Sequence, residues 1–148
     1  MTNVAVLGGG MVGAVIARDL AADPECSVTL VDVDAARLEA TRAASSDPLE
    51  TTVADCSDPA VVTGLCDDHE LIVGAMPGRF GFRVLQAVIE SGRNFCDISF
   101  MPEDAWDLDE LARSHGATCV VDMGVAPGMS NLLGGLSLIH ISEPTRRS

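Results

Sequence analysis

The sequence predicts an α/β fold built on a doubly wound parallel sheet. Short apolar runs rich in β-branched residues alternate with amphipathic helical segments along most of the chain. The strand-like runs are apolar on both faces, which is typical of parallel strands covered by helices. A glycine-rich turn joins the first such run to the first helical segment. Six strands connected by right-handed crossovers predict the order 3-2-1-4-5-6.

The first half of the chain follows this alternation. In its first helical segment, Val12, Ile16 and Leu20 are spaced to form one apolar face. Asp58 can cap a short helix that has Pro59 at its first position. The expected strands are residues 4–7, 27–31 and 51–54, and the expected helices are residues 11–22, 34–44 and 59–66.

The second half continues the pattern and marks its helix ends more clearly. Gly92 and Gly116 stand where helices are expected to stop, and Pro102 stands at the entry of the last helix. Within that helix, Leu108 and Leu111 are expected to face the core. The expected strands are residues 71–75, 95–98 and 118–121, and the expected helices are residues 82–91 and 103–114.

The turn after the first strand carries the pattern G-x-G-x-x-G at Gly8, Gly10 and Gly13. Gly8 permits a tight turn, Gly10 lets the backbone approach a pyrophosphate, and Gly13 lets the helix pack close to the sheet. Backbone N–H groups at the start of the helix, including those of Met11 and Val12, are expected to hold the phosphates. Because a strand precedes the pattern and a helix follows it, the sequence predicts a Rossmann nucleotide-binding domain.

Asp32 ends the second strand, 19 residues after Gly13. An acidic side chain at that place accepts hydrogen bonds from the adenosine ribose hydroxyls and repels a 2′-phosphate. The nearest arginine, Arg37, stands a turn into the next helix. We therefore expect NAD as the cofactor, with NADP the weaker alternative. Asp32 could instead cap the next helix, although Asp34 is the better cap.

Two loop segments are further candidates for cofactor contacts. Asp55 follows the third strand, where it either hydrogen-bonds the adenine amino group or serves as an ordinary turn residue. Ala75, Met76 and Pro77 follow the fourth strand, beside the topological switch point. They are expected to pack against the nicotinamide ribose, with Gly78 giving clearance, unless the segment is only a Pro-Gly turn.

Polar residues and a glycine end the last two strands. Asp97 and Ser99 end the fifth strand, and Asp122 and Gly124 end the sixth. The carboxyl ends of parallel strands meet at one rim of the sheet, so Asp97, Ser99 and Gly124 are candidates for the cofactor site. Each is equally compatible with a role as a helix cap or turn former.

The composition excludes several classes of protein. The net charge of −13 and the absence of a basic patch argue against a nucleic-acid partner. No apolar run reaches the roughly 18 residues that a membrane span needs, and no export signal is visible, so we expect a cytoplasmic protein. The acidic, lysine-free composition is typical of salt-rich cytoplasm. A GC-rich genome is the alternative explanation for it.

The remaining chemistry-bearing residues give no metal or catalytic pattern. The five cysteines are odd in number and lack C-x-x-C spacing, so we expect free thiols that pack as small hydrophobes, and no zinc site. His69 is expected in a solvated loop, and His115 at the charged end of a helix. Trp106 is expected to be a packing residue. The chain contains no tyrosine and no lysine, which excludes a Tyr–Lys catalytic pair and a general-base lysine. The sequence therefore assigns no catalytic residue.

Four segments resemble successive blocks of the saccharopine dehydrogenase and lysine 6-dehydrogenase family. The resemblance runs from about residue 3 to residue 135, and the sequence pattern is most similar to that of the lysine 6-dehydrogenase branch. The last block is the most specific, because generic nucleotide-binding domains do not carry Ala-Pro-Gly-Met-Ser-Asn. The four blocks are residues 6–13, 74–78, 96–100 and 122–131.

The resemblance implies an NAD(P)-dependent oxidoreductase acting on CH–NH or CH–NH2 groups of an amino-acid substrate. A C–H bond beside the amine nitrogen gives hydride to the nicotinamide, and the resulting imine is hydrolysed. The family also implies a second domain that holds most of the substrate, with residues 124–131 facing nicotinamide and substrate. Two alternatives stay open, a carboxynorspermidine-type imine reductase and an NAD-sensing regulatory module. A homodimer of the full-length protein also stays open.

The composition changes abruptly at Leu136. Residues 136–146 resemble the in-frame translation of a transposon-end adapter used in sequencing libraries. We therefore expect an NAD(P)-binding domain at residues 1–135 and a non-native tail at residues 136–148. The alternative is a native strand followed by a native tail. On the first interpretation, the sequence is truncated before the substrate domain and the fragment itself is inactive.

Overall fold

The structure is a computed structural model that describes residues 1–142. It contains a six-stranded, all-parallel sheet in the order β3-β2-β1-β4-β5-β6, which confirms the predicted fold class and strand order. The strands are β1 (Thr2–Leu7), β2 (Cys26–Asp32), β3 (Glu50–Val53), β4 (Leu71–Gly74), β5 (Asn94–Asp97) and β6 (Cys119–Val120). The helices are α1 (Met11–Ala21), α2 (Ala35–Ala43), α3 (Pro59–Asp68), α4 (Gly78–Glu90), α5 (Asp109–His115) and α6 (Met129–Ser142), with a 3₁₀ helix η1 (Ala105–Leu108) before α5.

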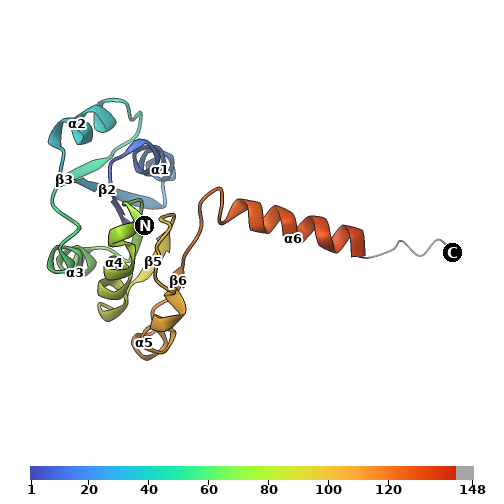
Figure 1. Cartoon of the computed structure of the whole chain (residues 1–148). Coiled ribbons are helices and arrows are strands. Elements are labelled where there is room, and N and C mark those ends of the chain that lie inside the picture. The colour runs from blue at the N-terminus through green and yellow to red at the C-terminus, as the bar shows by residue number, and fades with distance from the viewer. Residues whose placement is uncertain (143–148) are drawn as a thin grey trace.

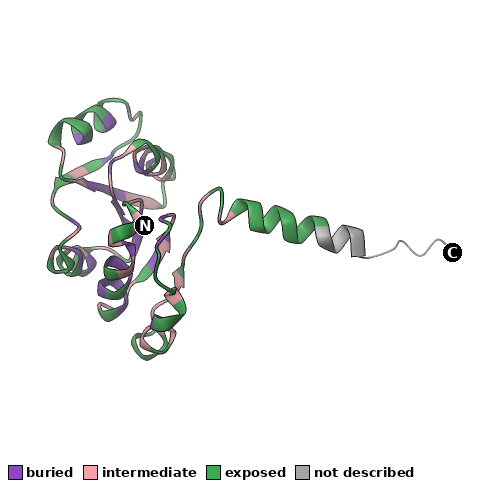
Figure 2. Ribbon diagram, in the orientation of Figure 1, coloured by how far each residue is buried: buried purple, intermediate pink, exposed green. Residues whose placement is uncertain are grey.

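The core lies in two layers, one on each face of the sheet (Figure 2). The strand period of two sends Ala5 and Leu7 of β1 to one face, and Val4 and Val6 to the other. The first face is covered by α3, α4 and α5, and the second by α1 and α2. Both faces of β1 are therefore buried, as the continuous apolar run predicted.

The buried face of α1 differs from the predicted one. Gly13, Ala17 and Ala21 are its buried residues, whereas Val12 is 55% exposed. The prediction was wrong because small residues let this helix lie close to the sheet, while the larger side chains are displaced to its flanks. Ile16 and Leu20, which flank the contact, are only partly buried.

Two helices in the second half begin at other residues than predicted. Helix α4 begins at Gly78 rather than at residue 82, with Pro77 as its N-cap. The segment predicted to start a helix at residue 103 forms η1 first, and the Asp104 carboxylate caps it by accepting a hydrogen bond from Trp106 N at 2.9 Å. Helix α5 then ends at Gly116 in the left-handed conformation (φ 67°), as predicted.

His69 and Trp106 occupy other environments than predicted. His69 is half-buried, and its ring nitrogens lie 2.8 Å from Leu65 O and 3.0 Å from Thr29 Oγ1, so it joins α3 to β2. Trp106 is 77% exposed because η1 turns it outward, so it is not a core residue. His115 is the last residue of α5, as expected, and its Nδ1 lies 3.0 Å from Leu111 O.

Helix α6 projects away from the sheet (Figure 1). Its described side chains, residues 129–137, are exposed, including Leu132 at 64% and Leu133 at 58%. The helix continues through Leu136, so no change in backbone marks the predicted start of the tail. Residues 143–148 of that predicted tail lie outside the described residues. Within the described part, no helix is long and apolar enough to span a membrane.

Candidate functional site

The glycine-rich turn lies between β1 and α1, at the carboxyl ends of the central strands. Gly8 has φ 103°, and a Cβ there would lie 2.6 Å from Ala75 O, so only glycine fits this turn. Gly13 is equally restricted, because an added Cβ would overlap the Gly8 carbonyl oxygen. Both glycines therefore shape the turn as the sequence predicted.

The start of α1 faces outward from this turn. Gly10 is the N-cap, and within the described residues no side chain caps the helix and no atom lies within 4 Å of an added Cβ at Gly10. Met11 is 92% exposed and Val12 is 55% exposed. The first N–H groups of α1 are thus left for a ligand or water, and the helix dipole favours an anion there.

Asp32 faces the glycine-rich turn from the end of β2. Its Oδ2 accepts a hydrogen bond from Gly9 N at 2.6 Å, and its Oδ1 accepts one from Asp34 N at 2.9 Å. The side chain is 9% exposed. Asp34, not Asp32, caps α2, as predicted, since its Oδ1 accepts from Ala36 N and Arg37 N. Asp32 therefore stands beside the turn as a nucleotide site requires.

Arg37 is the residue that sequence reasoning undervalued. Its Nη1 lies 3.6 Å from Asp32 Oδ2, and its Nη2 lies 3.7 Å from Asp34 Oδ2. Arg37 lies in the first turn of α2, close to where the sequence placed it, and from there its guanidinium reaches the Asp32 carboxylate at the end of β2. The sequence carries no clear signal for this pairing, because it depends on the angle at which α2 leaves β2.

Asp55 makes a local turn in the loop after β3. Its Oδ1 accepts a hydrogen bond from Ser57 N at 3.0 Å, and contacts with Ser57 lower the pKa of the carboxyl. The adjacent Cys56 thiol is buried, and burial followed by the charge of Asp55 raises its pKa to about 12. These contacts favour the turn role of Asp55, while its contact with adenine stays a prediction. The described cysteines are all free thiols, as expected.

The segment after β4 packs against the glycine-rich turn. The Ala75 Cβ would lie 3.1 Å from a Cβ at Gly13, and Met76 is partly buried against the core. Ala75, Met76 and Pro77 thus stand beside the turn, where the sequence expected them. Gly78 differs, because it is the first residue of α4, and an added Cβ there would meet the backbone after β5. Its lack of a side chain serves this packing rather than clearance for a ligand.

Asp97 and Ser99 lie beneath the rim rather than on it. They are 1% and 6% exposed, and the Ser99 hydroxyl donates a hydrogen bond to the Asp97 carboxylate. A Cβ at Gly74 would overlap Asp97 Oδ1, so the missing side chain makes room for this carboxyl. Burial raises the pKa of Asp97, the Ser99 hydrogen bonds lower it, and the charge of Asp122 raises it further.

The segment after β6 folds into a turn at the same edge. Asp122 is exposed and has φ 59°, in the left-handed region, and Met123 N donates to Asp97 O at 3.0 Å. Gly124 forms a bridge with Gly128, whose φ is 123°. Gly124 is therefore placed near Asp97, and the predicted last motif forms a closed turn that leads into α6.

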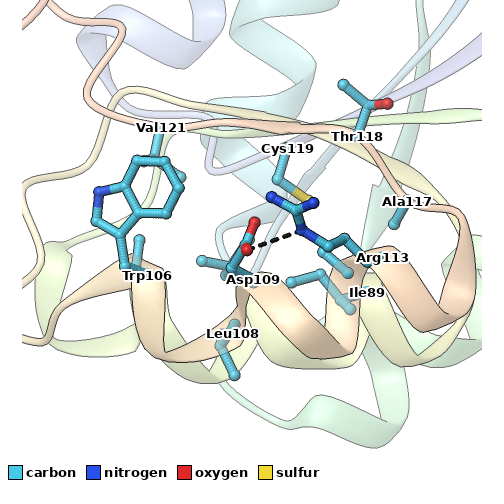
Figure 3. Close-up of a pocket in the computed structure, with 12 residues that line it drawn as sticks. Ile89, Trp106, Leu108, Asp109, Arg113, Ala117, Thr118, Cys119 and Val121 are labelled. Atoms are coloured by element: carbon cyan, nitrogen blue, oxygen red, sulfur yellow. Dashed lines mark hydrogen bonds and ion pairs between the residues drawn. The ribbon is translucent and has the colours of Figure 1, made fainter.

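A pocket lies beside β6, away from the glycine-rich turn (Figure 3). This pocket of about 400 Å³ lies between α4, α5 and β6, and Figure 3 shows Trp106 at one end and the Asp109–Arg113 ion pair across it. Arg113 Nε lies 2.8 Å from Asp109 Oδ2. The pocket shares no lining residue with the glycine-rich turn. Among the described residues, no cluster of three or more His, Cys, Asp or Glu side chains can hold a metal ion.

A parallel sheet in this order, with a glycine-rich turn leading into α1, defines a dinucleotide-binding domain of the Rossmann class. The family model described as the saccharopine dehydrogenase NADP binding domain matches residues 4–120, and the chain belongs to this family. It is therefore an NAD(P)-binding domain of saccharopine dehydrogenase-like oxidoreductases, as the resemblance predicted. Neither the imine-reductase nor the sensor alternative is favoured by the matches.

Individual relatives agree with the family. The chain is 26% identical over 133 residues to saccharopine dehydrogenase [NADP(+), L-glutamate-forming] of Schizosaccharomyces pombe, covering 89% of this chain and 29% of that protein. The solved apo saccharopine dehydrogenase (L-Glu forming) of Saccharomyces cerevisiae matches with a TM-score of 0.83 at 22% identity, covering 95% of this chain and 31% of that one. The chain thus spans less than a third of the length of these relatives.

A third match comes with a bound nucleotide. GenD2 from gentamicin A biosynthesis, solved in complex with NAD, matches with a TM-score of 0.62 at 25% identity, covering 81% of this chain and 34% of that one. The family model is described as an NADP binding domain, whereas this neighbour was solved with NAD. The matches therefore support a nicotinamide dinucleotide and leave the choice between the two to the residues of this chain.

Burial of Asp97 predicts a pH dependence of stability. Its pKa is raised in the folded state above the ordinary value of about 3.9, so folding favours the protonated carboxyl. The stabilisation is complete below about pH 3.9 and is lost as the pH rises through the folded pKa. Relative to Asp97→Asn, the native chain should therefore lose unfolding free energy as the pH rises from about pH 3.5 to about pH 7. Urea unfolding at both pH values measures this, and a constant difference would contradict it.

Proposed function

We propose that this chain is the cofactor-binding domain of an enzyme that oxidises the C–N bond of an amino-acid amine with NAD, as saccharopine or lysine 6-dehydrogenases do. The observation that carries the cofactor proposal is the Asp32 carboxylate beside the glycine-rich turn, 2.6 Å from Gly9 N. The amine substrate rests on the family and on the names of the relatives. The proposed substrate is therefore a small molecule with an amino-acid end.

The residues of the site fit a dinucleotide. Gly10 has open space in front of it, and the first N–H groups of α1 point outward, so a pyrophosphate fits there without moving the backbone. Asp32 is placed to accept hydrogen bonds from the ribose hydroxyls. When bound, the nicotinamide supplies the hydride chemistry, and the chain contributes binding and orientation.

The nicotinamide end of the proposed site falls at the carboxyl ends of β4, β5 and β6. Ala75, Met76 and Pro77 support it from one side, and the turn at Gly124 supports it from the other. Asp97 and Ser99 are buried beneath this end and contribute by holding the loop after β5 rather than by touching the cofactor.

We further propose that residues 1–135 form the nucleotide-binding domain and that substrate is held by parts of the enzyme outside this chain. The support is that the chain covers about 30% of its saccharopine dehydrogenase relatives. Hydride transfer needs the donor carbon about 3–3.5 Å from the nicotinamide, and a misplacement of 1 Å can cost roughly 10²-fold in rate. One side of a cleft cannot provide that constraint.

The test is binding and turnover by the purified chain. We expect the chain to bind NADH, measured by nicotinamide fluorescence, but to produce no NADH from NAD with lysine or saccharopine, measured at 340 nm. The Gly13→Val variant serves as the control for specific binding. Failure of the folded chain to bind any nicotinamide dinucleotide would contradict the proposed function. Turnover of either amine would contradict the proposed division between domains.

A further inference from the structure

We propose that Asp97 is a positioning residue for the nicotinamide end of the cofactor, because its buried carboxyl fixes the loop after β5 against the segments that end β4 and β6. This inference rests on the proposed function, since it concerns the same nucleotide site. The placement of the nicotinamide ring is thereby assigned to a side chain that does not touch the cofactor. Among the residues whose burial the structure describes, Asp97 is the only fully buried one with a carboxyl or basic side chain, at 1% exposure.

Asp97 joins the ends of three neighbouring strands. Its carboxyl lies directly against Gly74 at the end of β4, where an added Cβ would overlap Asp97 Oδ1. Its backbone oxygen accepts a hydrogen bond from Met123 N at 3.0 Å, in the turn after β6. The next residue, Ile98, donates its N–H to Gly74 O at 3.1 Å. The ends of β4, β5 and β6 are therefore tied together at Asp97 and its neighbour.

The loop after β5 is enclosed on its other sides by glycines. Ser99, whose hydroxyl donates a hydrogen bond to the Asp97 carboxylate, has its Oγ 2.7 Å from the place of an added Cβ at Gly81 of α4. The Ile98 carbonyl oxygen lies 3.5 Å from the place of an added Cβ at Gly124. Because its neighbours are packed this closely, the loop has little room to shift while the pair of Asp97 and Ser99 is intact.

The three strand ends joined by Asp97 are the ones proposed to hold the nicotinamide, since the cofactor lies across the carboxyl ends of the strands. The adenosine end is placed at Asp32 on β2, and β1 and β4 lie between β2 and β5 in the sheet. Groups that react need to be held to within about 0.5 Å by neighbours whose own positions are fixed. A satisfied buried polar pair rigidifies the segment around it. Loss of Asp97 should therefore disturb the nicotinamide end and spare the adenosine end.

NADH and 5′-AMP separate the two ends. NADH fluorescence reports the surroundings of the nicotinamide ring, whereas 5′-AMP occupies only the adenosine end. Asp97→Ala leaves space beneath Gly74 and removes the partner of the Ser99 hydroxyl. The enhancement of NADH emission on binding should be lost in large part, and NADH affinity should fall roughly fivefold or more, because a mobile nicotinamide end forfeits contacts comparable to one hydrogen bond. The affinity for 5′-AMP, measured by calorimetry, should change less than about twofold, as expected for a distant site.

Two variants control for a general loss of stability. Asp97→Asn keeps the volume of the side chain and an acceptor for the Ser99 hydroxyl, so it should recover most of the NADH emission that Asp97→Ala loses. Thr29→Val removes another buried polar contact, between Thr29 Oγ1 and His69 Nε2 at 3.0 Å, which joins β2 to the end of α3. It should lower the free energy of unfolding and leave NADH emission and both affinities unchanged. If Asp97→Ala does not fold, Ser99→Ala, which removes only the hydroxyl, takes its place with the same expected pattern.

The outcomes separate this inference from the proposed function. If Asp97→Ala binds NADH with native affinity and emission, or weakens NADH and 5′-AMP equally, the inference is overturned, while the proposed function stands. An equal loss of NADH emission in Thr29→Val would also overturn it, because general destabilisation would then explain the effect. If the folded native chain binds neither NADH nor 5′-AMP, the proposed function fails together with the inference. Selective loss of NADH emission and affinity in Asp97→Ala, with recovery in Asp97→Asn, supports the inference.

Discussion

Gly13→Val is expected to abolish measurable nucleotide binding and to lower the free energy of unfolding by about 3 kcal/mol. An added Cβ at Gly13 would overlap the Gly8 carbonyl oxygen and would lie 3.0 Å from the Gly8 carbonyl carbon and 3.1 Å from Ala75 Cβ. These neighbours are backbone and a short side chain, so none of them can rotate away. Helix α1 would have to move off the sheet, and its first N–H groups would move with it. Urea unfolding and NADH fluorescence measure the two effects.

Two other glycines provide matched controls for this variant. Gly64 in α3 has no described atom within 4 Å of an added Cβ, so Gly64→Val makes the same chemical change without overlap and should leave binding intact. Gly10→Ala also meets no described atom, so it should preserve the free energy of unfolding. Its methyl group would stand where the pyrophosphate approaches, so this variant should weaken nucleotide binding without loss of stability. A Gly13→Val chain with native stability and native affinity would contradict the packing assigned to this turn.

The sheet was predictable because its signals are local. Continuous apolar β-branched runs mark strands buried on both faces, and the glycine spacing marks the turn from β1 into α1. Each signal lies within about ten residues of sequence, which is the range that periodicity can resolve. The strand order follows from these signals and from the handedness of crossovers, and it is the order observed.

The predictions failed where the structure depends on small residues. Periodicity assigns the buried face of a helix to its largest apolar side chains, but the contact of α1 is made by Gly13 and Ala17. Likewise, Asp97 at a strand end reads as a solvated residue, yet the space left by Gly74 admits its carboxyl to the interior. The sequence does not reveal the close approach of α1 to the sheet or the space beside Gly74, because each depends on which two elements pack together.

The glycine-rich turn and Asp32 were predictable from the sequence, whereas the neighbour of Asp32 on α2 was not. Gly8, Gly13 and Asp32 occupy the positions expected from their spacing. The pairing of Arg37 with Asp32 depends on the angle at which α2 leaves β2, which the intervening residues do not specify. The sequence alone therefore favoured NAD without showing that a cation lies beside Asp32.

Asp32→Ala is expected to weaken NAD binding by roughly tenfold or more, and to narrow the difference between NAD and NADP. The variant loses the acceptor for the ribose hydroxyls, and hydrogen bonds to a charged group contribute about 1.5–3 kcal/mol. It also removes the like charge that opposes a 2′-phosphate, and it leaves Arg37 without one of its two carboxylate neighbours. NADP binding should therefore fall less than NAD binding. Titrations with NADH and NADPH at fixed ionic strength measure both affinities.

Asp34→Asn is the matched control for this last variant. It removes a carboxylate two residues away, while an asparagine can still cap α2 as Asp34 does through Ala36 N and Arg37 N. NAD affinity should then change less than about twofold, because a solvent-exposed charge contributes little. Two results would contradict the role of Asp32: equal losses of NAD affinity in the two variants, or NADP binding by the native chain that equals or exceeds NAD binding.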